Sequence, residues 1–227
     1  MSVRFDAGGD RLARTTGLPG SQPYTVCGWA LRARDTNTYS CLTLLIGGPS
    51  YVYVGTDSDG DSLRSFSHNG DAAVVATLGT GGWFFWAYVA NAGIQVLSHA
   101  PGGGALGSRT VNASGLLSAS LWTVGNNDIL TQPFDGRLTA LKAWDAALSQ
   151  AELEAEMAAA APVRTADLHG WWPLPSHTDL ADYSGHGRDW TADGTLTTED
   201  GPPWLTPGVA QRRSRTSSRT GSRQVDL

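Results

Sequence analysis

The chain of 227 residues contains little cysteine, a single lysine and no long apolar run. Two cysteines are too few for the disulfide scaffold of a small secreted domain. No stretch approaches the roughly 18 apolar residues that a membrane span needs, and the first residues contain no apolar core of a signal peptide. The sequence therefore predicts no membrane partner and no export by the general secretory route.

Basic residues are scarce in the body of the chain and concentrated at its C-terminus. Residues 1–210 contain eleven basic and twenty acidic residues, a formal charge of −9, whereas the complete chain carries −5. Such an acidic body argues against binding to duplex DNA or to an anionic membrane, because phosphates attract clustered Lys and Arg. Nucleic acid or a neighbouring subunit could contact the basic tail, although disorder is its default interpretation. Its arginines are Arg212, Arg213, Arg215, Arg219 and Arg223.

Glycine, proline and aromatic residues are abundant, which favours β-structure. The 28 glycines and 11 prolines supply turns, while nine tryptophans, six tyrosines and five phenylalanines favour half-buried strands. We predict one all-β domain over residues 1–205 and a Ser- and Arg-rich tail over 206–227. The predicted strands are 3–5, 24–33, 41–46, 51–54, 72–78, 83–89, 94–97, 121–124 and 138–144.

One helix is predicted near residues 149–160. Ser149 and Glu152 have the spacing of a capping box, and Pro162 ends the Ala- and Glu-rich run that follows. Glu152, Glu154 and Glu156 superficially match the paired carboxylates that glycan hydrolases carry on a strand. On a helix, however, residues i and i+2 point about 200° apart. No Gly-x-Ser-x-Gly or His-Glu-x-x-His motif occurs either, so we predict that the chain is not an enzyme.

Two segments allow a prediction about the thiols. If 24–34 and 39–47 form a hairpin, Cys27 and Cys41 lie about 15 Å apart, which is beyond bridging range. The sequence therefore predicts two buried free thiols.

Five segments together resemble the laminin-G-like or concanavalin-A-like jelly rolls of bacterial and phage surface proteins. They are VRFDAGGDRLART (3–15), YTVCGWALRA (24–33), GGWFFWAYVA (81–90), FDGRLTALKAWDAALSQAELEAEM (134–157) and HGWWPLPSHTDLADYSGHGRDWTADGTL (169–196). The last segment often comes first in relatives. The resemblance implies a two-sheet antiparallel jelly-roll sandwich, and it covers about residues 3–205.

Jelly rolls of this kind often hold calcium with loop oxygens, so two acidic loops are candidate metal sites. Asp57, Asp59 and Asp61 lie within five residues, although a β-turn explains them as well. Asp182 and Asp189 enclose a glycine-containing loop, where carboxylates could instead cap turns. Calcium is the one cofactor that the sequence makes a candidate.

Carbohydrate binding needs exposed aromatic faces together with polar side chains that hydrogen-bond to sugar hydroxyls. Alternation along a strand lets only one of Trp171 and Trp172 face the core. The candidate ligand-binding residues are Trp171, Trp172, Tyr183, Trp190 and Trp204.

Residues 83–86, Trp-Phe-Phe-Trp, place aromatics on both faces of a central strand, which predicts cover on both sides by the chain itself or by another subunit. The resemblance implies a non-catalytic component of a phage particle or similar surface assembly, such as a decoration, tail or adhesion protein. Such a component would be located on a virion or an extracellular surface and would contact other subunits, including copies of itself, or surface glycans. The alternatives are a free carbohydrate-binding module and, less favoured, a glycan hydrolase.

Overall fold

Two antiparallel sheets pack face to face in the computed structural model, which describes residues 1–6, 8–19, 22–34, 39–48, 50–57, 62–67, 72–112 and 119–205. Within these residues lie one helix, α1 (Gln150–Met157), and fifteen strands. The strands are β1 (Ser2–Phe5), β2 (Arg11–Arg14), β3 (Tyr24–Arg32), β4 (Cys41–Gly47), β5 (Ser50–Thr56), β6 (Ser62–Ser67), β7 (Ala72–Thr77), β8 (Trp83–Asn91), β9 (Ile94–Pro101), β10 (Gly107–Asn112), β11 (Leu121–Val124), β12 (Gly136–Trp144), β13 (Leu168–Trp172), β14 (Thr191–Asp193) and β15 (Thr197–Glu199).

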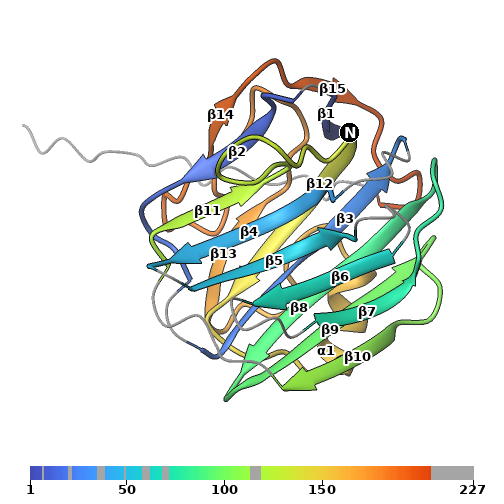
Figure 1. Ribbon diagram of the computed structural model, residues 1–227, viewed down its shortest axis with the longest axis vertical. Helices are drawn as coiled ribbons and strands as arrows, with labels where there is room; N and C mark the ends of the chain where they lie inside the picture. The colour runs from blue at the N-terminus through green and yellow to red at the C-terminus, as the bar shows by residue number, and fades with distance from the viewer. Residues whose placement is uncertain are drawn as a thin grey trace, which may run out of the picture.

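The eight-stranded sheet has the order β10-β9-β8-β3-β12-β1-β15, with β13 also paired to β12. The seven-stranded sheet has the order β14-β2-β11-β4-β5-β6-β7. Figure 1 views the sandwich with the seven-stranded sheet in front and α1 behind the eight-stranded one. The predicted jelly-roll sandwich with one short helix is confirmed. The division at residue 205 stays a prediction, because the tail lies outside the described residues.

The predicted hairpin between 24–34 and 39–47 is wrong. Strand β3 pairs with β8 and β12 in one sheet, whereas β4 pairs with β5 and β11 in the other. The apolar pattern of both segments reports burial but carries no information about which strand is the partner. The conclusion drawn from that hairpin nevertheless holds, because Cys27 and Cys41 are both buried and free.

The main core lies between the sheets and is filled by large side chains from both. From β8 it receives Phe84, Trp86 and Tyr88, and from the opposite sheet it receives Leu45, Val54 and Trp122, all at most 3% exposed. Burying such a side chain contributes about 1.5–3 kcal/mol each. This core fixes the two sheets against each other, so each sheet has one outward face left.

The outward face of the eight-stranded sheet is also apolar, and the chain covers it. Alternate residues of β3 and β8 point there, among them Trp29, Trp83 and Phe85, each at most 8% exposed. Leu153 of α1 and Leu205 pack against this second core. The two-sided aromatic strand is therefore covered on both sides within one chain, the first of the two predicted kinds of cover.

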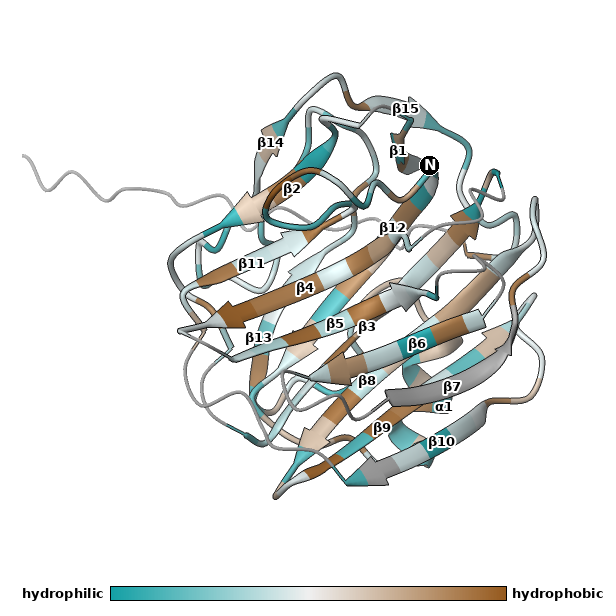
Figure 2. Cartoon of the chain, viewed as in Figure 1, coloured by the Kyte–Doolittle hydropathy of each residue, from teal (hydrophilic) through white to brown (hydrophobic). Residues whose placement is uncertain are grey.

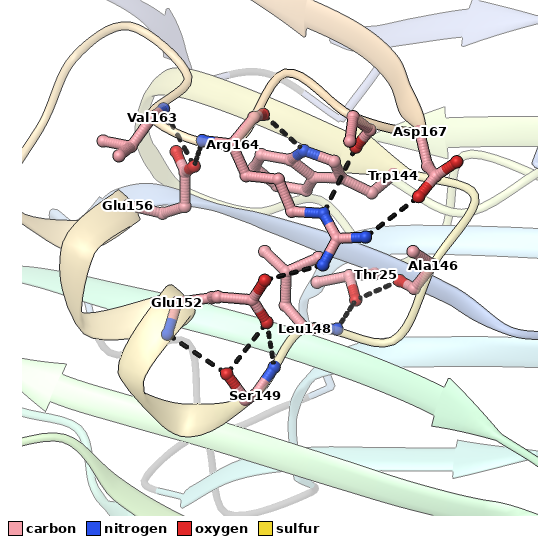
Figure 3. A network of polar contacts seen from close by, with 11 residues as sticks. Thr25, Trp144, Ala146, Leu148, Ser149, Glu152, Glu156, Val163, Arg164 and Asp167 are labelled. Carbon is pink, nitrogen blue, oxygen red and sulfur yellow. Dashed lines mark hydrogen bonds and ion pairs between the residues drawn. The ribbon is translucent and has the colours of Figure 1, made fainter.

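Helix α1 is fixed by the capping box that the sequence predicts. The Ser149 hydroxyl accepts from the Glu152 backbone N–H, and the Glu152 carboxylate accepts from the Ser149 backbone N–H at 2.8 Å. Arg164 donates to that carboxylate at 2.6 Å and to Asp167 at 2.9 Å (Figure 3). These contacts join the helix to the loop that leads into β13.

A buried ion pair attaches the same helix to the sheet beneath it. The Lys142 ammonium of β12 lies 2.8 Å from the Glu156 carboxylate, and their side chains are 1% and 0% exposed. The other Glu156 oxygen accepts from the backbone N–H groups of Val163 and Arg164 (Figure 3). Every oxygen of this carboxylate thus has a partner, as a buried charge requires.

A bulge in β12 puts Lys142 on that face. The register against β3 shifts between Thr139 and Lys142, and Ala140 has a positive φ of 51°. As a result Leu138, Leu141 and Ala143 all belong to the inter-sheet core, while Ala140 and Trp144 belong to the outer one.

No helix in the described part of the chain is long and apolar enough to cross a membrane.

Candidate functional site

No helix of the described residues lies over the outward face of the seven-stranded sheet, which carries a groove of about 340 Å³, here called the outer-face groove. Strands β4, β5 and β6 form its floor, and Figure 2 shows apolar segments along β4 and β5. The loop that precedes β12 forms its polar edge. Its lining residues are Leu44, Ile46, Gly48, Ser50, Tyr51, Tyr53, Phe66, Asn127, Asp128 and Gln132.

Strand register assembles the aromatic floor of this groove. Leu44, Tyr53 and Phe66 lie opposite one another across three strands, and Tyr51 follows two residues from Tyr53 on the same face. The Tyr53 and Phe66 rings stack with centroids 4.6 Å apart, and Tyr51 meets Phe66 edge-on at 6.1 Å. Tyr51 and Phe66 are partly exposed, so their rings present apolar surface to the groove.

Tyr53 supports this floor from below. It is 2% exposed, and its hydroxyl donates to the backbone oxygens of Ser40 (2.8 Å) and Thr56 (3.2 Å). Burial raises the pKa of this hydroxyl well above its usual value, so the group remains a neutral donor. Phe66 is therefore held in place by a rigid neighbour.

The edge of the groove offers polar groups that the described protein leaves unused. The Asn127 amide is engaged with Thr131, donating to its hydroxyl and accepting from its N–H, which shapes the loop. The side chains of Asp128, Gln132 and Ser50 make no hydrogen bond to the described residues. A carboxylate, an amide and a hydroxyl thus lie beside partly exposed aromatic rings, and this is the combination by which proteins bind sugars.

Trp171 and Tyr183, two of the predicted ligand residues, come together on the other side of the molecule. Their rings lie 5.8 Å apart at 59° and line a second groove of about 330 Å³, here called the Trp171 groove. Trp171 points away from the inter-sheet core, and the adjacent Trp172 points into it, as alternation predicts. The rest of the lining is Ala161, Pro162, Thr165, Leu168, Ser184 and His186.

The structure corrects the prediction for Trp172 and Trp190. They are 0% and 5% exposed and meet Trp122 edge-on in the core, at 5.4 and 4.9 Å. The Arg14 guanidinium lies over both rings at 5.3 and 5.5 Å, where burial lowers its pKa to about 10. Both rings are enclosed, so packing explains them and they present no face to a ligand.

Trp204 is 48% exposed and belongs to neither of these grooves. Its ring meets Trp29 edge-on at 5.5 Å, so it covers part of the second core. One side of Trp204 lines a third hollow, near Trp83 and His99 at the ends of β8 and β9. Burial lowers the pKa of His99 below its usual value, which keeps its imidazole uncharged near neutral pH.

The first acidic loop is described only at Asp57. Its carboxylate accepts from the Ser62 backbone N–H at 3.4 Å and lies 3.8 Å from the Arg64 side chain. Those contacts fit the turn interpretation of this residue. Asp59 and Asp61 lie outside the described residues, as do the five tail arginines, so calcium binding in this loop stays a prediction.

The second acidic loop uses its carboxylates to hold its own backbone. Asp182 accepts from the backbone N–H groups of Trp171, Ser184 and Arg188 at 2.9–3.2 Å, and Asp189 accepts from that of Asp182 at 2.8 Å. Burial alone would raise the pKa of Asp182, but these hydrogen bonds keep it below its usual value. Among the described residues no three metal-ligating side chains cluster. The loop geometry fits the turn-capping alternative, and a calcium site at Asp182 and Asp189 stays a prediction.

The residues of the outer-face groove were missed because no single segment contains them. Tyr51 and Tyr53 do share one face of a strand by their spacing. Their alignment with Phe66 depends on the register of β5 against β6, and Asp128 and Gln132 reach them only through the fold. The run Tyr-Val-Tyr was the one local signal available.

Comparison with known proteins agrees with this architecture. Neither the known family models nor the curated protein sequences match the chain. A proposed carbohydrate-binding protein from Bacteroides ovatus has a similar structure, with a TM-score of 0.62 and 14% identity over 88% of this chain and 60% of that one. The chain thus matches less than two thirds of the length of that protein.

Two further structures share the fold. The heptameric SAP-like pentraxin from Limulus polyphemus has a TM-score of 0.59 and 13% identity, over 87% of this chain and 95% of the pentraxin. Tailspike protein 2 of a bacteriophage of Escherichia coli O157:H7 has a TM-score of 0.58 and 13% identity, over 75% of this chain and 26% of the tailspike. At these identities the likeness establishes the concanavalin-A-like jelly-roll fold alone.

Proposed function

We propose that the chain is a non-catalytic glycan-recognition module and that the outer-face groove is its binding site. The observation that carries the proposal is the placement of the partly exposed Tyr51 and Phe66 rings beside the unused polar groups of Asp128 and Gln132. A pyranose ring has an apolar face that packs on aromatics and hydroxyls that hydrogen-bond to carboxylate and amide groups. The volume of about 340 Å³ lies in the range of small-ligand sites.

The charge of the groove selects among glycans. Among the described residues that line it, Asp128 is the one carboxylate, and no lysine, arginine or histidine is present. A negative group at the edge repels sialic, uronic and sulfated sugars. We therefore expect neutral or amino sugars as ligands.

The same composition argues against glycoside hydrolysis. Most glycosidases use two carboxylates that flank the scissile bond, and the lining of the outer-face groove provides one. The acids of α1 that share the spacing of catalytic carboxylates have other partners: Glu152 caps the helix, Glu154 meets Gln150 and Glu156 pairs with Lys142. Binding without cleavage is the activity that these residues support.

We further propose that the module works within a surface assembly such as a phage particle. The tailspike and the heptameric pentraxin share its fold, which makes an assembly role compatible with this architecture. The arginine-rich tail supplies a positive segment that could dock on the acidic body of a neighbouring copy. Replacing its five arginines by glutamine should lower the mass measured by light scattering at low salt; an unchanged mass would contradict a role of the tail in self-assembly.

A glycan array tests the binding proposal. Wild type should bind a set of neutral or amino glycans, and Asp128→Ala should weaken that binding by about tenfold, the equivalent of one charge-assisted hydrogen bond. Phe66→Ala should remove the stacking surface and most of the signal for the glycans that Asp128→Ala weakens. Ile129→Ala is the matched control, since Ile129 is 69% exposed in the same loop and does not line the groove. A blank array with wild type, or equal binding by all variants, would reject the proposal.

A further inference from the structure

We infer that the Trp171 groove is a second glycan-binding site, so that one chain binds two glycans on opposite faces. The inference rests on the proposed function for the class of ligand, but its own residues carry it. Trp171 lies on the outward face of the eight-stranded sheet, and the outer-face groove lies on the outward face of the other sheet. The two sites share no residue, and the inter-sheet core separates them.

The Trp171 groove has the chemistry of a sugar site. The Trp171 and Tyr183 rings, tilted by 59°, form an aromatic corner against which the apolar face of a pyranose can pack. The Thr165 hydroxyl and the Nε2 atom of His186 make no hydrogen bond to the described residues. Both side chains are exposed, so they can reach ligand hydroxyls at the open side of the corner.

The corner is rigid before any ligand arrives. The Tyr183 N–H donates to the Trp171 carbonyl at 2.8 Å, and the Tyr183 hydroxyl donates to Asp179 at 2.7 Å. Asp182 accepts from the Trp171 N–H, which ties the loop to the strand. Preorganised side chains lose little entropy when a ligand binds, and a weak ligand such as a sugar depends on that saving.

The lining also indicates which ligands fit. Among the described residues, no carboxylate, lysine or arginine lines the Trp171 groove, whereas Asp128 lines the other one. Neutral sugars therefore suit both sites, and amino sugars suit the outer-face groove better. A difference in charge at similar volume, about 330 and 340 Å³, predicts overlapping but unequal specificities.

The same glycan array, read with variants of each groove, tests this inference. Trp171→Ala should lose at least about tenfold in signal for a subset of neutral glycans that Phe66→Ala retains. Trp204→Ala is the matched tryptophan control, because Trp204 lines neither groove. Should Trp171→Ala fail to fold, the double variant Thr165→Ala with His186→Ala removes exposed polar groups only and should weaken the same subset.

Bivalence has its own measurement. The probe is a neutral oligosaccharide that both Trp171→Ala and Phe66→Ala still bind on the array, used both as a coating on beads and as a fluorescent free ligand. Wild type on the beads should capture the free ligand through its second groove, while Trp171→Ala and Phe66→Ala should each bind the beads without capturing it. An array profile of Trp171→Ala and of the double variant equal to that of wild type would overturn the inference and leave the proposed function standing. If Trp171→Ala lost all glycan binding while Phe66→Ala lost none, that result would overturn both the proposed role of the outer-face groove and bivalence.

Discussion

The outward faces of the two sheets differ in what their polar groups do. On the eight-stranded sheet, α1 covers the surface, and Lys142, Glu156 and Glu152 are all engaged within the chain. On the seven-stranded sheet, Asp128 and Gln132 beside the aromatic floor make no side-chain hydrogen bond to the described residues. Polar groups that are satisfied internally stabilise a fold, and those that are left unsatisfied at a surface are available to a ligand. The polar groups around α1 thus stabilise the fold, whereas those at the edge of the outer-face groove stay available to the ligand that we propose there.

The largest loss of stability is expected from removing the buried ion pair between Lys142 and Glu156 on the covered face. Lys142→Met leaves the Glu156 carboxylate buried without a cation, and the free energy of unfolding should fall by about 3–5 kcal/mol. Urea unfolding measures this change. The double variant Lys142→Met with Glu156→Leu removes the stranded charge and should regain much of the loss. A single-variant change below about 1 kcal/mol would mean that the pair does not hold the helix.

A smaller effect is expected at the capping box of α1. Hydrogen bonds from Ser149 and Arg164 lower the pKa of Glu152 to about 2, below the unfolded value of about 4.3. A carboxyl with a depressed folded pKa contributes its stability in full above the unfolded pKa and loses it as pH falls through the folded pKa.

Glu152→Ala should therefore lower stability by about 0.5–1 kcal/mol at pH 7, a value reduced by the exposure of this carboxyl to solvent. The difference from wild type should shrink between about pH 4 and pH 2. Thermal unfolding as a function of pH measures it. Glu154→Ala is the control on the same helix, since Glu154 meets only Gln150 among the described side chains. An equal effect of both variants at all pH values would contradict the assignment of the cap.

Local patterns predicted the elements of both faces better than their assembly. The strand at 24–33, the aromatic strand at 83–89 and the capped helix follow from alternation and capping chemistry, which act within one segment. Alternation also separated Trp171 from Trp172. Strand β12 departs from simple alternation, because the bulge at Ala140 moves Leu141 to the core side.

The candidate site was harder to predict for a related reason. From the sequence, Trp190 is as good a candidate ligand-binding residue as Trp171, and only its packing against Trp122 shows that it belongs to the core. Phe66 lines the groove because of the register of β6 against β5. Asp128 lines it because the fold brings there a loop that lies 62 residues further along the chain. Which strands become partners is set by long-range packing, and a single sequence does not express it.

The smallest predicted difference between the two faces is in the reactivity of the two thiols, because each thiol is buried on a different face. Cys27 lies beneath α1 in the second core, and Cys41 clusters with Leu44 and Tyr53 under the outer-face groove. Burial raises the pKa of Cys27 to about 12 and that of Cys41 well above its usual value, so neither is a thiolate at pH 8. Reaction with a disulfide reagent then requires local opening. Cys41, which is covered by no helix of the described residues, should react about tenfold faster than Cys27. The variants Cys27→Ala and Cys41→Ala separate the two rates, and a faster Cys27 would show that the region under α1 opens more readily than the region under the outer-face groove.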